Sequence, residues 1–82
     1  MQYDRGMLQI IIKIKVRKVR KRKGITIAQL SNISGISESY ISELERGKKI
    51  PTLYVICALA AALEVNETEL YEKEIIHIKK SL

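Results

Sequence analysis

Several residue types on which small proteins depend for stability or chemistry are scarce in this chain. Its 82 residues include one Cys, one His and one Pro, and neither Trp nor Phe. A single Cys and a single His exclude an intrachain disulfide and a zinc site built from these residues. The sequence also lacks a nucleophile paired with a base, a pair of carboxylates and a phosphate-binding loop. We therefore expect no enzymatic activity, no cofactor and no metal.

Long apolar runs are missing as well. The longest, residues 53–63, is far short of the roughly 20 residues that a membrane-spanning helix needs. The N-terminus lacks the charged, apolar and small segments of a secretory signal. Together with the unpaired Cys, these absences predict a reduced, cytoplasmic location without membrane contact. A domain of this size buries only about 60–65% of the surface of its unfolded chain, which leaves little room for an enclosed substrate pocket.

Positive charge, by contrast, is abundant and unevenly distributed. The chain has 15 Lys and Arg against 9 Asp and Glu, which gives a net charge of +6. Residues 1–24 carry most of the excess, and eight of the eleven residues from 13 to 23 are basic. Such a block is typical of a surface that binds nucleic acid, but a solvated helix face explains it equally well.

The N-terminal third predicts an arm followed by a helix. Between residues 8 and 14, every second residue is Leu or Ile, and this alternation suits a short strand. An overlapping set of apolar residues with i, i+4, i+7 spacing suits one face of a helix instead. That set consists of Ile12, Val16 and Val19. We expect a helix over residues 12–23, closed by Gly24, and an extended arm before it.

Two short helices separated by a tight turn come next. Thr26 and Gln29 have the spacing of a capping box, which marks a helix start. Gly35 stands where the chain must turn sharply with positive φ, and Ser37 is a suitable N-cap for a helix over residues 38–46. The pattern predicts a helix-turn-helix.

Two further helices are expected in the C-terminal half. Residues 53–63 follow the N-cap Thr52 and are apolar almost all round, which predicts a central helix. Asn66 and Glu69 repeat the cap-and-acid pattern at the start of a fifth helix. The sequence therefore predicts an all-α, five-helix, single-domain fold.

The residues between 24 and 65 make this pattern more specific. The segments GITIAQLS (24–31), SGISESYISELERG (34–47), PTL (51–53) and AAALEV (60–65) resemble, in order and without gaps, the lambda-repressor-like (Cro/repressor-type, XRE) helix-turn-helix family. The resemblance covers about residues 12–70. It implies a repressor-like transcriptional regulator whose third helix lies in the major groove of double-stranded DNA.

The same resemblance implies roles for individual residues. Base contacts fall to the start of the third helix, namely Glu38, Ser39, Ser42 and Glu43, with Ser37 and Tyr40 near the backbone or a thymine methyl. Phosphate contacts fall to Thr26, Ile27, Lys48 and Lys49.

Two residues depart from the family pattern. Ile27 stands where the family often has Gln, so its contact must be made by the backbone or be absent. Glu38 stands where Gln or Lys is common, and it either accepts from a cytosine amino group or stabilises the helix N-terminus.

The resemblance also implies an ion pair between Arg20 and Glu45. In the family, such a pair joins the end of the first helix to the end of the helix that reads DNA. A guanidinium and a carboxylate can form two parallel hydrogen bonds. We therefore predict a structural role for this pair rather than DNA contact.

The two ends of the chain suggest a dimer. An i, i+4, i+7, i+11 stripe runs past the expected core, and it consists of Tyr71, Ile75, Ile78 and Leu82. Because exposed apolar stripes usually meet a partner, we expect a homodimer built from the last helix, with pairing of the N-terminal arms as an option. The alternative is that both segments fold back on their own core.

These expectations define three segments and two functions. Residues 1–11 form an N-terminal arm, residues 12–70 the DNA-binding domain, and residues 71–82 a helical extension that makes the dimer contact. The leading function is regulation of transcription by a dimer on a palindromic operator. The alternative is an antitoxin or another protein-interaction module, which would use the helix-five stripe to bind a toxin or an anti-repressor.

Overall fold

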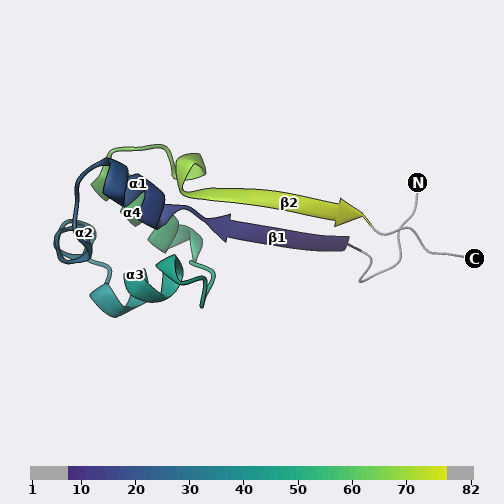
Figure 1. Cartoon of the computed structure of the whole chain (residues 1–82), viewed down its shortest axis with the longest axis horizontal. Coiled ribbons are helices and arrows are strands. Elements are labelled where there is room, and N and C mark those ends of the chain that lie inside the picture. Colours follow the sequence, from purple (N-terminus) through teal and green to yellow (C-terminus); the bar gives the residue numbers. More distant parts are fainter. Residues whose placement is uncertain (1–7, 78–82) are drawn as a thin grey trace, which may run out of the picture.

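The computed structural model describes residues 8–77, which form a helical head and a two-stranded ribbon (Figure 1). The elements, in chain order, are β1 (Leu8–Ile14), α1 (Val16–Arg22), α2 (Ile27–Ser34), α3 (Glu38–Glu45), α4 (Leu53–Leu63), the 3-10 turn η1 (Glu67–Leu70) and β2 (Tyr71–His77). Among these residues, no helix has both the length and the apolar character needed to cross a membrane.

One hydrophobic core holds the head together. Leu30 from α2, Ile41 and Leu44 from α3 and Leu59 from α4 are completely buried in it. The full set of buried apolar side chains is Val16, Val19, Leu30, Ile41, Leu44, Val55, Ile56, Leu59, Ala60, Leu63 and Leu70. Because α4 supplies five of these eleven, the prediction of a central fourth helix is confirmed for its inner face. Its other face, which includes Cys57, is exposed.

The prediction of an all-α fold with five helices is wrong. Four α-helices are present in residues 8–77, and two strands pair antiparallel at the ends of this segment. Their register joins Leu8 to His77, Ile11 to Glu74 and Ile14 to Tyr71. The first helix is accordingly shorter than predicted, since residues 12–14 belong to β1 and α1 begins at Val16.

The expected fifth helix stops after one turn. Asn66 and Glu69 do form the predicted capping box, in which the Glu69 carboxylate accepts from the Asn66 backbone at 3.2 Å. Tyr71 then adopts extended dihedrals, with φ −151° and ψ 156°. Since Leu70 is buried and its carbonyl accepts from the Lys15 backbone N–H at 2.8 Å, the chain is directed into pairing with β1. Tyr71 and Ile75, the described members of the stripe predicted for helix five, therefore lie on a strand and not on a helix.

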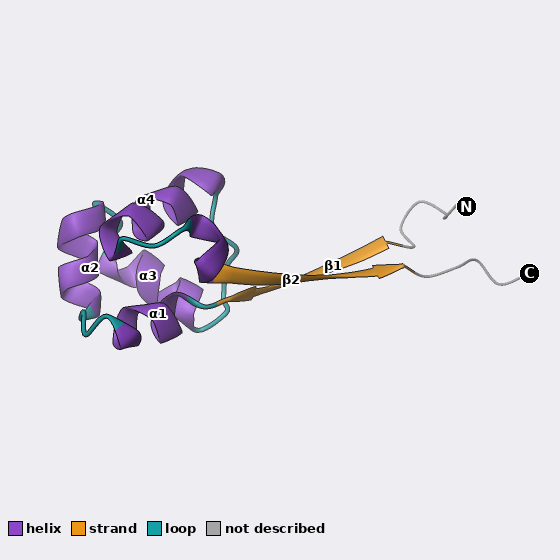
Figure 2. Cartoon of the chain, turned by 90° about the horizontal axis from the view of Figure 1, so that it is seen from above, coloured by secondary structure: helices purple, strands orange, loops and turns teal. Residues whose placement is uncertain are grey.

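The ribbon projects from the head as a separate arm (Figure 2). The described chain measures 54 × 21 × 19 Å along its principal axes, and the ribbon extends along the longest one (Figure 1). Successive side chains of a strand point to opposite faces, so each paired position presents two side chains on the same side. The ribbon consequently has two chemically different faces.

Candidate nucleic-acid interface

Local hydrogen bonds fix the start of each helix in the α2–turn–α3 unit. The Thr26 hydroxyl accepts from the Gln29 backbone at 3.1 Å, and the Gln29 side chain accepts from the Thr26 backbone at 2.9 Å. This is the predicted capping box. Gly35 follows α2 with φ 77°, and the Ser37 hydroxyl accepts from the Tyr40 backbone at 3.2 Å. The sequence signals for these boundaries are therefore confirmed.

An ion pair fastens the end of α3 to α1. The Arg20 Nε and Nη2 atoms donate to the two carboxylate oxygens of Glu45 at 2.7 and 2.9 Å. A third bond runs from Arg20 Nη1 to the Ile25 carbonyl at 2.9 Å. The two side chains are only 10% and 6% exposed, so neither reaches outward to a ligand. The predicted structural pairing of Arg20 with Glu45 is present.

This pairing also sets the protonation of Arg20. The hydrogen bonds to Glu45 raise the pKa of Arg20 above its ordinary value, and the charge of Glu45 adds to them, while burial acts in the opposite direction. The guanidinium therefore stays charged at physiological pH. A guanidinium–carboxylate pair with this two-pronged geometry is a rigid joint.

The outward face of α3 carries the residues predicted to read bases. Ile41 and Leu44 point into the core, whereas Glu38 and Ser39, near the start of the helix, are exposed. Ser42 and Glu43 are half-buried one turn further along. The helix thus brings these four predicted base contacts together on one surface, with hydroxyl and carboxylate groups that can bond to base edges.

Glu43 is not an isolated negative charge on this surface. The Lys49 ammonium lies 3.0 Å from its carboxylate and 4.3 Å from the centre of the Tyr40 ring. Lys49 was predicted to contact phosphate. In the structure its ammonium pairs with Glu43 and lies over the face of the Tyr40 ring, where the ring attracts the positive charge. The loop after α3 therefore folds back on the helix that it follows.

The other residues predicted to contact phosphate differ in which of their groups are accessible to it. Lys48 is exposed beside the C-terminal end of α3. Thr26 is exposed, but its hydroxyl is engaged in the cap. Ile27 packs against the core, so it can contribute only its backbone N–H at the start of α2. This agrees with the expectation of a backbone contact or none.

Arg46 belongs with this surface although the sequence interpretation omitted it. It is exposed directly after α3, and its Nε donates to the Ser42 carbonyl at 3.4 Å. A basic residue at a helix end, two positions before Lys48, was the available signal. With Arg46 included, cationic side chains border the C-terminal end of the outward face of α3.

The predicted dimer residues are only partly described. Tyr71 and Ile75 lie on β2 and share one face of the ribbon. Ile78 and Leu82 lie outside the described residues. Within residues 8–77, the part of the predicted helix-five stripe that is described lies on a strand, so an interaction module would have to use the ribbon there instead of a helix face.

Comparison with known proteins identifies the same unit. A family model described as helix-turn-helix matches residues 16–70. The HTH-type transcriptional regulator SlrR of Bacillus subtilis is 42% identical over 66 residues, which is 79% of this chain and 43% of that protein. The chain therefore spans less than half the length of this relative. The uncharacterised HTH-type transcriptional regulator y4dJ of Sinorhizobium fredii is 42% identical over 53 residues, 65% of this chain and 69% of that protein.

Solved structures share the fold at similar identity. The restriction-modification controller protein C.AhdI from Aeromonas hydrophila matches with a TM-score of 0.65 and 34% identity, over 67% of this chain and 83% of that one. The clp gene regulator ClgR from C. glutamicum matches with a TM-score of 0.62 and 33% identity, over 66% of this chain and 70% of that one. The matched portion of each comparison is about the size of the helical head.

Proposed function

Because the chain belongs to the XRE-type helix-turn-helix family of DNA-binding transcriptional regulators, we propose that it binds a palindromic operator as a homodimer. In this proposal α3 of each copy enters the major groove of one half-site. The two half-sites are spaced by one helical turn of DNA or a multiple of it. Occupancy of a promoter by the dimer then represses transcription without catalysis and without a cofactor.

The observation that carries the proposal is the way in which α3 is held. Its start is capped by Ser37, its end is tied to α1 through Glu45, and its inner face is buried through Ile41 and Leu44. These three restraints leave one face of the helix turned outward. A rigid helix with an outward polar face is the element that reads base edges in this class of protein.

The charges around α3 support a DNA partner. Pairing of Glu43 with Lys49 removes one negative charge from the surface that would approach phosphates. Arg46 and Lys48 supply positive charge at the end of the helix, and the net charge of +6 attracts DNA at longer range. Affinity supplied by phosphate contacts falls by roughly 0.9 log unit per contact for each tenfold rise in salt, so binding should depend strongly on ionic strength.

Selection of binding sites from random double-stranded DNA tests the proposal. The full chain should enrich a palindromic sequence, and a synthetic duplex carrying it should bind two copies per site. A duplex with scrambled half-sites is the control and should bind much more weakly at the same salt concentration. Selection that enriches no palindrome, or one copy bound per full site, would overturn the proposal.

A further inference from the structure

One face of the ribbon is mostly apolar and exposed to solvent. Leu8, Ile10 and Ile12 on β1 and Ile75 on β2 are between 39% and 57% exposed. These four lie on the same side, because the register pairs Ile10 with Ile75 and alternate residues of a strand share a face. Lys73 and His77, the partners of Ile12 and Leu8, lie on this side too. We call this set the apolar ribbon face. The opposite face is mixed, with Gln9, Ile11, Lys13, Glu72, Glu74 and Ile76.

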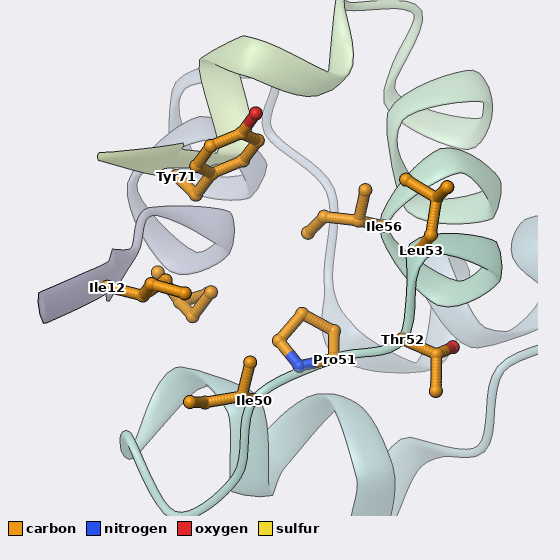
Figure 3. Close-up of a pocket in the computed structure, with 8 residues that line it drawn as sticks. Ile12, Ile50, Pro51, Thr52, Leu53, Ile56 and Tyr71 are labelled. Carbon is orange, nitrogen blue, oxygen red and sulfur yellow. The ribbon is translucent and has the colours of Figure 1, made fainter. Parts of the chain in front are cut away.

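The apolar ribbon face continues into a hollow where the ribbon meets the head. Ile12 and Tyr71 from the ribbon line this hollow together with residues 50–53 and Ile56 (Figure 3). Its volume is about 230 Å³. On its rim, Ile50 and Leu53 are 68% and 76% exposed. We call this hollow the root pocket.

Exposed apolar side chains are concentrated on this one surface. Of the nine large apolar side chains exposed in residues 8–77, six lie on the apolar ribbon face or the rim of the root pocket. They are Leu8, Ile10, Ile12, Ile50, Leu53 and Ile75. A two-stranded ribbon is at best marginally stable in water when nothing packs against it. Contiguous apolar patches of this kind mark an interaction site.

We propose that the apolar ribbon face and the root pocket bind the same surface of a second copy of this chain. The two ribbons stack face to face and antiparallel, about a two-fold axis that is perpendicular to the strands. The outer end of each apolar ribbon face, at Leu8, then lies against the root pocket of the partner. This inference deepens the proposed function and rests on it, because it names the surface through which two copies assemble on DNA.

The distribution of side chains makes this surface complementary to itself. In the antiparallel arrangement, the Ile12–Lys73 pair of one ribbon faces the Ile10–Ile75 pair of the other. Apolar groups therefore meet along β1, while the stem of Lys73 covers the partner's Ile75 and its ammonium reaches water at the ribbon edge. The charged groups of the mixed face, including the Lys15–Glu72 pair at 3.4 Å, stay in water. A two-fold dimer requires this kind of self-complementary patch.

The ribbon face alone is too small for a stable dimer interface, so we include the root pocket in the contact. Seven residues at about 3.3 Å each and strands about 4.8 Å apart give a face of roughly 23 by 10 Å. This is well below the roughly 800 Å² that each partner buries in a typical stable interface. Since Ile50, Leu53 and the root pocket extend the apolar area onto the head, docking of each ribbon end against the partner head supplies part of the missing area.

The arrangement also suits a pair of DNA-reading helices. The strand β1 forms the ribbon edge nearer α3 (Figure 1), and residues 11–14 share a hollow with residues 44–47 at the end of α3. The two-fold axis lies between the stacked ribbons, parallel to their faces and perpendicular to the strands. Rotation about it reverses the strand direction and turns the ribbon over, but the β1 edge stays on the same side. The two heads then lie at opposite ends of the stacked ribbons with both α3 helices facing the same way.

Adjacent residues of β1 provide a matched test. Ile10 and Ile11 are 57% and 50% exposed but point to opposite faces of the ribbon. Sedimentation velocity of the full chain without DNA should show a dimer at micromolar concentration. The substitution Ile10→Lys should weaken dimerisation by roughly 100-fold or more, because it places a charge in an apolar contact, whereas Ile11→Lys should change it less than about threefold.

Several outcomes would overturn the proposal. A wild-type chain that is a monomer at tens of micromolar excludes the dimer, and equal effects of the two substitutions indicate pairing through strand edges instead. Because the readout contains no DNA, it separates this inference from the proposed function. Selection of a palindrome by a protein whose dimer is unaffected by Ile10→Lys would reject the ribbon contact alone.

Cross-linking tests the antiparallel docking without a charge in the ribbon. Two variants, Leu8→Cys and Leu53→Cys, each also carry Cys57→Ser so that no other thiol is present. When they are mixed and oxidised, a disulfide should form mainly between the two different variants. Exclusive linkage of Leu8→Cys to itself, or no linkage in a mixture that sediments as a dimer, would overturn the antiparallel arrangement.

Discussion

Arg20 on α1 and Glu45 at the end of α3 form a two-pronged ion pair that is almost completely buried, with N–O distances of 2.7 and 2.9 Å. The pair joins α1, the most basic of the described helices, to α3, whose outward face is proposed to read bases. Its guanidinium also holds the Ile25 carbonyl at the entry to α2. One side chain therefore sets the position of α3 relative to both α1 and the start of α2.

Loss of either partner should destabilise the head strongly. We expect Glu45→Ala to lower the free energy of unfolding by ~3–5 kcal/mol, because it leaves the Arg20 charge buried without its partner. Thermal denaturation should show this as a large fall in melting temperature. The control is Glu72→Ala, which removes a mostly exposed partner of Lys15 and should cost less than about 1 kcal/mol. An unchanged melting temperature for Glu45→Ala would show that the pair does not stabilise the fold.

Two serines separated by one residue should have different roles. Ser37→Ala removes the cap of α3 and should cost about 1 kcal/mol of stability. Ser39→Ala changes an exposed side chain and should leave stability within about 0.5 kcal/mol, but should reduce discrimination between DNA sequences. Urea denaturation and binding titrations measure the two effects. Equal losses of stability would argue against the assignment of Ser39 to the reading surface.

The loop lysines should also be distinguishable. Lys48→Met should reduce the slope of log affinity against log salt by about 0.9, the value for one phosphate contact. Lys49→Met should weaken DNA binding more than Lys48→Met, because it leaves the Glu43 carboxylate uncompensated near phosphates. Addition of Glu43→Gln to Lys49→Met should recover most of that extra loss. Failure of the double variant to recover affinity would show that Glu43 does not face DNA.

The turn η1 gives the protein an acid-sensitive contact. Acceptance of the Asn66 backbone hydrogen bond lowers the pKa of Glu69 below its ordinary value of 4.5, with a smaller contribution from Arg22, while desolvation opposes the shift. The ionised carboxylate therefore stabilises the fold above pH 4.5, and this contribution is lost as the pH falls through the lowered pKa.

Comparison of wild type with Glu69→Gln isolates this effect, because the amide oxygen can still accept the cap hydrogen bond. Urea denaturation at a series of pH values should show the largest difference in stability at neutral pH. The difference should shrink toward zero below pH 4.5. A difference that is independent of pH would contradict the role of the charge.

The helical head could be predicted because its boundaries depend on neighbours in sequence. The capping boxes at Thr26 and Asn66, the turn at Gly35 and the cap at Ser37 each involve contacts within a few residues. Such contacts leave a direct mark on the local sequence. The partners of the Arg20–Glu45 pair are 25 residues apart in sequence. This pair was predicted from the family resemblance, because no local sequence pattern indicates it.

The ribbon could not be predicted because a strand is stabilised by its partner. Residues 8–14 pair with residues 71–77, and no local signal links segments so far apart. Both segments also have apolar residues at helical spacing, and this ambiguity is typical of short apolar runs. The β-branched side chains at Ile10 and Ile75, which favour extended backbone, face each other only once the pairing exists.

The exposed face of α3 was predicted in outline, but the ion pair on it was not. Glu43 and Lys49 were assigned separate DNA contacts, whereas the loop after α3 brings them within 3.0 Å of each other. A loop conformation depends on the packing of both flanking elements, so the sequence alone does not reveal it. The net charge of +6 is consistent with this surface but does not define it.

Selection of DNA sites by wild type and by Ser39→Gln tests most directly the claim that α3 reads two symmetric half-sites. Wild type should enrich a palindrome. The variant should enrich the same palindrome with a new preference for adenine at one equivalent position in each half, because a glutamine amide can bond to both adenine N6 and N7. Glu67→Gln, on η1, is the control and should select the wild-type site. Enrichment of no palindrome, or identical base preferences for wild type and Ser39→Gln, would contradict the account.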